Sequence, residues 1–363
     1  MARVAVVPLV AATLLLAGCL ADLGLGEART EWAYAATQLD QMADLGRTGS
    51  GVRVALLDTG VNPDHPALAH LFDGDRADGE VVGFQDFVAG RSATPYDDDG
   101  HGSHVLGIIG ADGSTLGDQL TYGGVDLQGG APEAQFYVAK VCGAESVGCP
   151  DSAVLAGLKW ATGQGAQVIS LSLGRAGGVA ALGGILGDEL TNAVNAAIDR
   201  GIVVVASAGN DGPDNADVGY PANIAGVLAV GAIQKDGAVW EGSNRGDTSM
   251  ACQMVPFLGN QGRCDPDKKP ELVAPGVEIL SAWTEGSYVK ATGTSQACPF
   301  VTATVALLLQ DRPALNDRAD VQHLKTTLMQ SAKPVGGQDK PHDAAAGYGV
   351  VQARAALDAY RPR

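Results

Sequence analysis

Short apolar runs alternate with longer mixed stretches along most of the chain. Five runs rich in Val, Ile, Leu and Ala predict strands, at residues 52–57, 136–141, 168–173, 202–206 and 227–232. Apolar runs of this length are typical of strands that a parallel sheet buries on both faces. The stretches between and after them predict helices at residues 152–162, 189–199, 296–309 and 320–330. We therefore predict an α/β fold, with a doubly wound, mainly parallel sheet that carries helices on both faces.

The first residues of the chain follow a different pattern. Arg3 precedes an apolar run over residues 5–17, which is shorter than the roughly 20 residues of a membrane-spanning helix and has the length of a signal-peptide core. The run ends at Leu16-Ala17-Gly18-Cys19, which resembles the lipobox of prokaryotic lipoproteins, in which the Cys thiol is lipidated. An ordinary secretory signal that ends near a Cys is the alternative. We predict a lipoprotein signal peptide at residues 1–18 and a lipid anchor on Cys19.

The remainder of the chain is predicted to form one domain. Polar stretches rich in Gly and Asp predict surface loops at residues 73–80, 94–100, 211–219 and 259–269. None of them is long enough, or biased enough in composition, to be a linker between domains. We predict a short linker at residues 19–30 and a single domain over residues 31–363.

Composition and charge narrow the class of function. Lys and Arg number 24 against 41 Asp and Glu, which gives a formal net charge of −17. A nucleic-acid partner is not expected, because such proteins need a basic face. Hydrophobic residues make up 46 % and charged residues 18 % of the chain, as in a globular protein. The 50 Gly residues predict many tight turns and close backbone approaches.

Four separate segments carry side chains suited to nucleophilic catalysis. Asp58 ends the first predicted strand, and Asn210 follows the strand predicted at residues 202–206. His101 in Gly-His-Gly and Ser295 in Gly-Thr-Ser each begin a predicted helix. In open α/β sheets, ligands bind outside the carboxyl ends of the strands. Each residue alone is a weak signal, but together they occur in the order Asp, His, Asn, Ser.

This order is the arrangement of the subtilisin-like serine peptidases, the subtilases, and the chain resembles that family from about Trp32 to about Gln330. Five further segments are similar to it: Gly129–Pro132, Tyr137–Val141, Ser170–Gly174, Gly219–Ala222 and Leu272–Gly276. The resemblance implies a subtilisin-like fold and a serine endopeptidase that hydrolyses peptide bonds through an acyl-enzyme. It also implies protein or peptide substrates and no cofactor for the chemistry, and we expect a monomer.

The expected roles follow from the chemistry of each group. Ser295 is the nucleophile and needs a base, which a neutral imidazole at His101 supplies. Asp58 would hold the tautomer of that ring and stabilise the imidazolium. The side-chain amide of Asn210 would donate to the oxyanion, together with the helix N-terminus at Ser295. We expect Pro299 in the first helical turn, where a missing N–H is tolerated.

The resemblance also places part of the substrate groove. Residues 172–174 are similar to the strand that pairs with an extended peptide. The residues expected to bind substrate are Ser172, Leu173, Gly174, Ala208, Gly209 and Gly219. Gly219 at the base of the pocket, with no acidic residue in these segments, indicates a large apolar side chain before the scissile bond.

Of the six Cys residues, five remain besides Cys19, together with several carboxylates. Export permits disulfides, and we predict two local pairs, Cys142–Cys149 and Cys252–Cys264, with Cys298 a small apolar core residue. Structural calcium is common among subtilases, but Ala67 stands where many relatives carry an Asp ligand. Hard oxygen ligands could come from Asp73, Asp75, Asp78 and Glu80 or from residues 97–99, although solvated acidic loops are the simpler interpretation, so no metal site is assigned.

Two other classes of function compete with an active peptidase. A peptide-binding relative without catalysis would have no reason to keep Asp58, His101, Asn210 and Ser295 together. An esterase or lipase on the α/β-hydrolase fold needs Gly-x-Ser-x-Gly and the order Ser, Asp, His, and Ser295 fits neither. We predict an exported serine endopeptidase, lipid-anchored on the outer face of the cell envelope or extracellular.

Overall fold

The structure, a computed structural model, describes residues 31–74, 79–88, 94–113, 127–144, 148–174, 188–213, 217–246, 267–312, 314–338 and 341–363. Over these residues the main sheet has seven parallel strands in the order β2-β3-β1-β4-β5-β6-β7. They are β1 (Arg53–Asp58), β2 (Glu80–Asp86), β3 (Gln135–Lys140), β4 (Val168–Leu171), β5 (Val203–Ser207), β6 (Leu228–Ile233) and β7 (Leu272–Pro275). An antiparallel pair, β8 (Ile279–Ala282) and β9 (Tyr288–Ala291), lies beside it.

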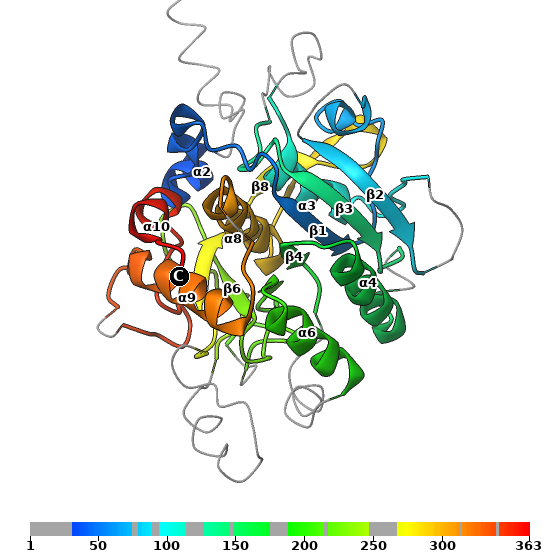
Figure 1. Cartoon of the computed structure of the whole chain (residues 1–363). Helices are drawn as coiled ribbons and strands as arrows, with labels where there is room; N and C mark the ends of the chain where they lie inside the picture. The colour runs from blue at the N-terminus through cyan, green and yellow to red at the C-terminus, as the bar shows by residue number, and fades with distance from the viewer. Residues whose placement is uncertain are drawn as a thin grey trace, which may run out of the picture.

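Helices cover both faces of this sheet (Figure 1). They are α2 (Glu31–Thr37), α3 (His101–Gly110), α4 (Asp151–Gly163), α6 (Glu189–Asp199), α8 (Thr294–Leu309), α9 (Arg318–Ser331) and α10 (Ala353–Ala359). Short 3-10 turns are η1 (Leu39–Gln41), η2 (Ala43–Leu45), η3 (Ala69–Phe72) and η4 (Thr284–Gly286). Helix α8 packs over β4 to β7 and against α3, whereas α4 packs against α6. This arrangement confirms the predicted doubly wound α/β fold.

The alternation of side chains along β1 decides which face carries the chemistry. A Cβ on Gly157 of α4 would contact the side chain of Leu57, and a Cβ on Gly110 of α3 would contact that of Phe136. Phe136 pairs with Val54 and Lys140 with Asp58, so these even-numbered positions of β1 share the face toward α3. Asp58 therefore faces α3, while Leu57 faces α4.

The direction of the chain across the sheet places a crevice at the end of β1. The next strands along the chain after β1 are β2 and β3, which lie on one side of β1 in the sheet, and the strands that follow, β4 to β7, lie on its other side. The sheet order thus reverses between β1 and β4, and such a switch point leaves an open crevice at the strands' carboxyl ends. Asp58 ends β1 and Ser172 directly follows β4. The fold therefore brings both residues to the same crevice.

Most predicted boundaries differ from the structure by one or two residues, and two differences matter for the site and the sheet edge. The strand predicted at residues 168–173 ends at Leu171, so residues 172–174 lie beyond the sheet, beside the crevice. Glu80, assigned to a surface loop, begins edge strand β2. That strand contains Gly83 and shifts register between Val81 and Gly83, and this irregularity hides the apolar alternation of an edge strand.

Candidate active site

The side chains of Asp58 and His101 form a close pair. Nδ1 of His101 lies 2.7 Å from Oδ1 of Asp58. The Asp58 side chain is only 1 % exposed, whereas that of His101 is 25 % exposed. The buried carboxylate therefore orients a ring whose other edge is open to the cleft.

Charge around His101 favours its protonated form. Burial alone lowers the pKa of the imidazole, but the charge and hydrogen bond of Asp58 oppose burial, and the charges of Asp99 and Asp97 add to them. The net result is a pKa above the usual value for histidine. The ring is thus suited to accept a proton and to hold it while a reaction proceeds.

A hydrogen-bonded cap fixes the start of α3 and so the position of His101. Oδ1 of Asp97 accepts from Gly100 N at 2.9 Å, and its Oδ2 accepts from the N–H and the hydroxyl of Ser103 at 2.9 and 2.7 Å. The hydroxyl of Thr59 donates to Asp97 and accepts from Gly102 N. Thr59 directly follows Asp58, so the cap joins the end of β1 to the helix that carries the base. The sequence indicated Asp97 only as a possible calcium ligand, and nothing in it pointed to this capping role.

Ser295 lies in the first turn of α8 and contacts Ser172. The Ser295 hydroxyl donates to the Ser172 carbonyl at 3.0 Å rather than to His101, and the Ser172 hydroxyl donates to the Ser295 carbonyl at 2.9 Å. The expected place of Pro299 was wrong: α8 begins at Thr294, so Pro299 is its sixth residue. Pro299 has no N–H for the carbonyl four residues earlier, which is that of Ser295. Ser172 supplies the missing donor.

Thr294 orients the side chain of Asn210. Oδ1 of Asn210 accepts from the N–H and from the hydroxyl of Thr294, both at 2.9 Å. The same hydroxyl accepts from Gly209 N at 3.0 Å. Because the amide oxygen is engaged twice, the amide nitrogen of Asn210 is left to donate to a ligand. Thr294 was not singled out from the sequence, although it immediately precedes Ser295.

One cleft of about 400 Å³ brings these groups together. Asp58, His101, Asn210 and Ser295 all line it, although they come from β1, α3, the turn after β5 and α8. Ser172, Leu173, Gly174 and Gly209 also line the cleft. Ala208 and Gly219 do not belong to its lining and are hydrogen-bonded to each other, from Gly219 N to Ala208 O at 2.7 Å. The geometry therefore gathers the predicted chemical groups and four of the six predicted substrate residues.

A disulfide forms part of the same rim. Cys142 and Cys149 are bonded, as predicted, and both line the cleft. Cys298 is buried and free, as expected for a core residue, and burial raises the pKa of its thiol to about 11. Cys19, Cys252 and Cys264 lie outside the described residues. The lipid anchor and the second disulfide therefore stay predictions.

Other candidate groups take structural places. His104 contacts the carbonyls of Ile279 and Val289, and burial lowers the pKa of its ring to about 4. No group of three or more His, Cys, Asp or Glu that could hold a metal ion occurs among the described residues. Asp75 and Asp78, named as possible calcium ligands, lie outside them. In the described part of the chain, no helix combines the length and the apolar character that crossing a membrane requires.

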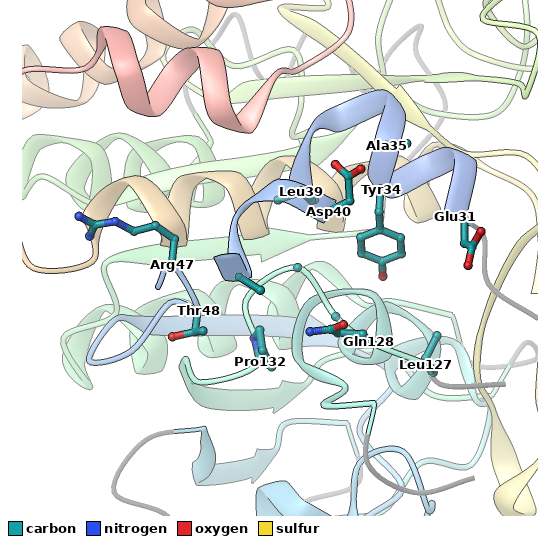
Figure 2. A pocket seen from close by; sticks show the side chains of 13 residues that line it. Glu31, Tyr34, Ala35, Leu39, Asp40, Arg47, Thr48, Leu127, Gln128 and Pro132 are labelled. Atoms are coloured by element: carbon teal, nitrogen blue, oxygen red, sulfur yellow. The ribbon is translucent and has the colours of Figure 1, made fainter. Parts of the chain in front are cut away.

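A second hollow, of about 310 Å³, lies between α2 and the loop that carries Gln128 (Figure 2). The phenol of Tyr34 points from α2 toward that loop. The hydroxyl of Tyr34 donates to Ile108 O, and Arg47 pairs with Asp311 at 3.1 Å. The described residues that line this second hollow include no Ser, Cys or His, whereas those of the first cleft include Ser295 and His101.

Comparison with known proteins agrees with this geometry. The profile of the subtilase family matches residues 49–349. The chain belongs to the subtilase family. It is 33 % identical over 296 residues to Subtilisin BL from Lederbergia lenta, an alignment that covers 82 % of this chain and 90 % of that protein. Over 266 residues it is 33 % identical to the Major intracellular serine protease of Bacillus subtilis (strain 168), covering 72 % and 70 % of the two chains.

Membership decides between the competing classes of function. This subtilase is a subtilisin-like serine endopeptidase, a hydrolase of peptide bonds. In this chain Asp58 and His101 precede Ser295, whereas the esterase alternative needs the order Ser, Asp, His.

Proposed function

We propose that Asp58, His101 and Ser295 are the catalytic triad of this endopeptidase and that Asn210 stabilises the oxyanion. The observation that carries the proposal is the shared cleft, which gathers these side chains from four separate elements around the 2.7 Å pair of Asp58 and His101. Ordered groups of this kind on rigid elements are typical of nucleophilic catalysis.

The chemistry then proceeds in two stages. When a peptide enters the cleft, the Ser295 hydroxyl exchanges its hydrogen bond with Ser172 O for one to Nε2 of His101, and catalytic hydrogen bonds commonly tighten in this way on binding. Ser295 Oγ attacks the carbonyl carbon while His101 takes its proton, and Asp58 stabilises the imidazolium. His101 gives the proton to the leaving amine. Water then repeats the attack on the acyl-enzyme with His101 as base and releases Ser295.

Asn210 acts on the charge that develops on the carbonyl oxygen. Thr294 holds the amide oxygen of Asn210, so the amide nitrogen can donate to the oxyanion without reorganising. The N-terminus of α8, a 16-residue helix that begins at Thr294, favours the same negative charge.

The substrate is a peptide held in extended form along residues 172–174. These residues lie beyond the end of β4 and line the cleft, so their backbone is available to pair with a peptide. A large apolar side chain before the scissile bond stays a prediction from the sequence, because Gly219, on which it depends, does not belong to the lining of the cleft.

Substitution of Asn210 and Ser295 tests the proposed roles. Asn210→Ala should lower kcat by about 10²–10³ with little change in KM, the size known for loss of an oxyanion donor in a subtilisin. Ser295→Ala should cost far more and abolish labelling by a serine-directed fluorophosphonate. If Asn210 only closes the turn after β5, its substitution will lower the melting temperature and leave kcat near the wild-type value.

We propose further that the enzyme is exported and held at a membrane by lipid on Cys19. The support is the sequence alone: an apolar run over residues 5–17 followed by Leu-Ala-Gly-Cys. Cys19→Ser should move the protein from the membrane fraction to the soluble fraction with its peptidase activity retained, because Cys19 precedes residues 49–349, which match the subtilase family. Leu20→Ser keeps the Cys and serves as the matched control. A wild-type protein that is already soluble, with no acyl mass on its N-terminal peptide, contradicts the proposal.

A further inference from the structure

A fully buried amide lies directly beneath the turn that presents Asn210. The side chain of Asn244 is 0 % exposed, and a Cβ built on Gly209 would overlap its amide nitrogen. Gly209 has φ +108°, a conformation that side-chain-bearing residues rarely adopt. Gly209, which immediately precedes Asn210, thus packs against the side chain of Asn244.

Asn244 is bonded to the residues on both sides of Asn210. Its backbone N–H donates to Gly209 O at 3.0 Å, and its Oδ1 accepts from Asp211 N at 2.7 Å. Its amide nitrogen donates to Asp211 Oδ2 at 3.3 Å and to Asp217 O at 3.4 Å. The backbone on either side of Asn210 is therefore held by a single buried side chain and its own main chain.

Asn244 is itself fixed to the sheet. The hydroxyl of the preceding residue, Ser243, accepts from Ala232 N of β6 at 3.1 Å, and Ser243 N donates to Trp240 O at 3.0 Å. The position of Asn244 is therefore tied to the sheet, and through Asn244 so is the turn that carries Asn210. Thr294 holds the side-chain oxygen of Asn210 and the N–H of Gly209. The carbonyl of Gly209 and the N–H of Asp211 are bonded to Asn244 instead.

We infer that Asn244 is a positioning residue for catalysis, which holds the backbone of Asn210 where its amide meets the oxyanion. This inference rests on the proposed role of Asn210. Asn244 is fully buried and is not among the described residues that line the cleft. Its effect must therefore pass through Asn210 and appear in the transition state, not in substrate binding.

A double-mutant cycle tests the inference. Asn244→Ala should lower kcat by about 10- to 100-fold, as expected for a misplaced catalytic donor, with KM nearly unchanged. In the Asn210→Ala background the same substitution should lower kcat by about twofold or less, because the group it positions is already absent. Asn244→Leu keeps the side-chain volume but removes the acceptor for Asp211 N, so it replaces Asn244→Ala in the cycle if that variant does not fold.

Gln310 provides a matched control, because it is another buried side chain that holds neighbouring backbone by hydrogen bonds. Its side chain, 6 % exposed, accepts from Thr48 N at 2.8 Å and Gly49 N at 3.0 Å, away from the cleft. Gln310→Ala should lower the melting temperature and leave kcat unchanged. Wild-type kcat in Asn244→Ala, or equal losses in both backgrounds, overturns the inference alone. A wild-type kcat in Asn210→Ala overturns the proposed oxyanion role and this inference with it.

Discussion

At the scale of single residues, three carboxylates control the protonation of His101. Asp58 contacts the ring, whereas Asp99 and Asp97 act through their charge, and together they raise the pKa of His101 despite its burial. The base must be neutral to accept a proton, so a raised pKa moves the acid limb of kcat/KM toward higher pH.

Removal of the Asp99 charge should reverse part of that shift. Asp99→Asn keeps the oxygen that accepts from His101 N at 3.2 Å but removes a charge that raises the pKa of His101. The pKa then falls, so the acid limb of kcat/KM should shift to lower pH, as measured on one peptide substrate across the acid range. Asp98→Asn is the control, because Asp98 pairs with Lys140 and is not among the groups that raise this pKa. An unchanged acid limb in Asp99→Asn contradicts the electrostatic account.

Sequence could identify the reacting groups but not the residues that hold them. Asp58 follows an apolar run and Ser295 stands at the start of a helix, and both are positions at which α/β proteins commonly place ligand-binding residues. Asp97 and Asn244 act through contacts that only the folded chain forms. Asn244 is 34 positions from Asn210 in the numbering and belongs to no apolar pattern, so nothing in the sequence links the two.

At the scale of elements, the start of α8 depends on a strand end. Pro299 leaves the Ser295 carbonyl without a helical donor, and the Ser172 hydroxyl replaces it at 2.9 Å. Ser172 follows the last residue of β4, so the helix that carries the nucleophile is bonded to the strand end that borders the cleft. The Ser172 hydroxyl thus compensates for the N–H that Pro299 lacks.

A stability cycle measures this compensation. In the inactive Ser295→Ala background, which prevents self-digestion, Ser172→Ala should lower the free energy of unfolding by about 1–3 kcal/mol, because it leaves a carbonyl unpaired. Pro299→Ala restores an N–H at the required position. The Ser172→Ala change should therefore cost about 1 kcal/mol less when Pro299→Ala is also present, as measured by urea denaturation. Strictly additive losses would show that the Ser172 hydroxyl does not replace the missing helical donor.

The sequence predicted strands in the middle of the sheet better than it predicted edge strands and strand ends. Strands β1 and β5 lie in the middle of the sheet and contain the apolar runs at residues 54–57 and 203–206, which indicate their positions. Edge strand β2 is interrupted by Gly83, and β4 ends before its apolar run does. Element ends depend on where neighbouring strands stop pairing, which is a property of the packed sheet.

At the scale of the whole molecule, a surplus of acidic residues on the chain contrasts with a buried group of balanced charge. Lys269, Lys325 and Glu271 have side chains that are 0 % exposed, and Asp267 is 16 % exposed. Lys269 contacts Glu271 at 2.9 Å, and Lys325 contacts Glu271 at 2.7 Å and Asp267 at 2.6 Å. Two ammonium groups thus share two carboxylates. The sequence gives no sign of this burial, because Lys and Glu are usually exposed.

Loss of one carboxylate from this group should destabilise the fold strongly. Glu271→Gln, again in the Ser295→Ala background, leaves two buried ammonium groups with one carboxylate, so the free energy of unfolding should fall by about 3–5 kcal/mol near pH 7. Glu241→Gln, at an exposed site, is the control and should change it by less than about 0.5 kcal/mol.

The cost of Glu271→Gln should also depend on pH, in a direction that Lys269 sets. Burial lowers the pKa of Lys269 to about 8, against the opposing charge of Glu271, whereas the unfolded chain keeps a pKa near 10.5. Between these values the native state binds fewer protons than the unfolded state, so the contribution of Lys269 to stability rises with pH. Loss of Glu271 removes a charge that raises the pKa of Lys269, so the variant releases this proton at lower pH than the parent does. Its deficit against the parent should therefore narrow between about pH 7 and pH 9.5, with the change coming below about pH 8, where the parent still holds the proton. Urea denaturation at both pH values measures the deficit, and a deficit that stays constant or widens would show that Lys269 remains charged in the folded protein.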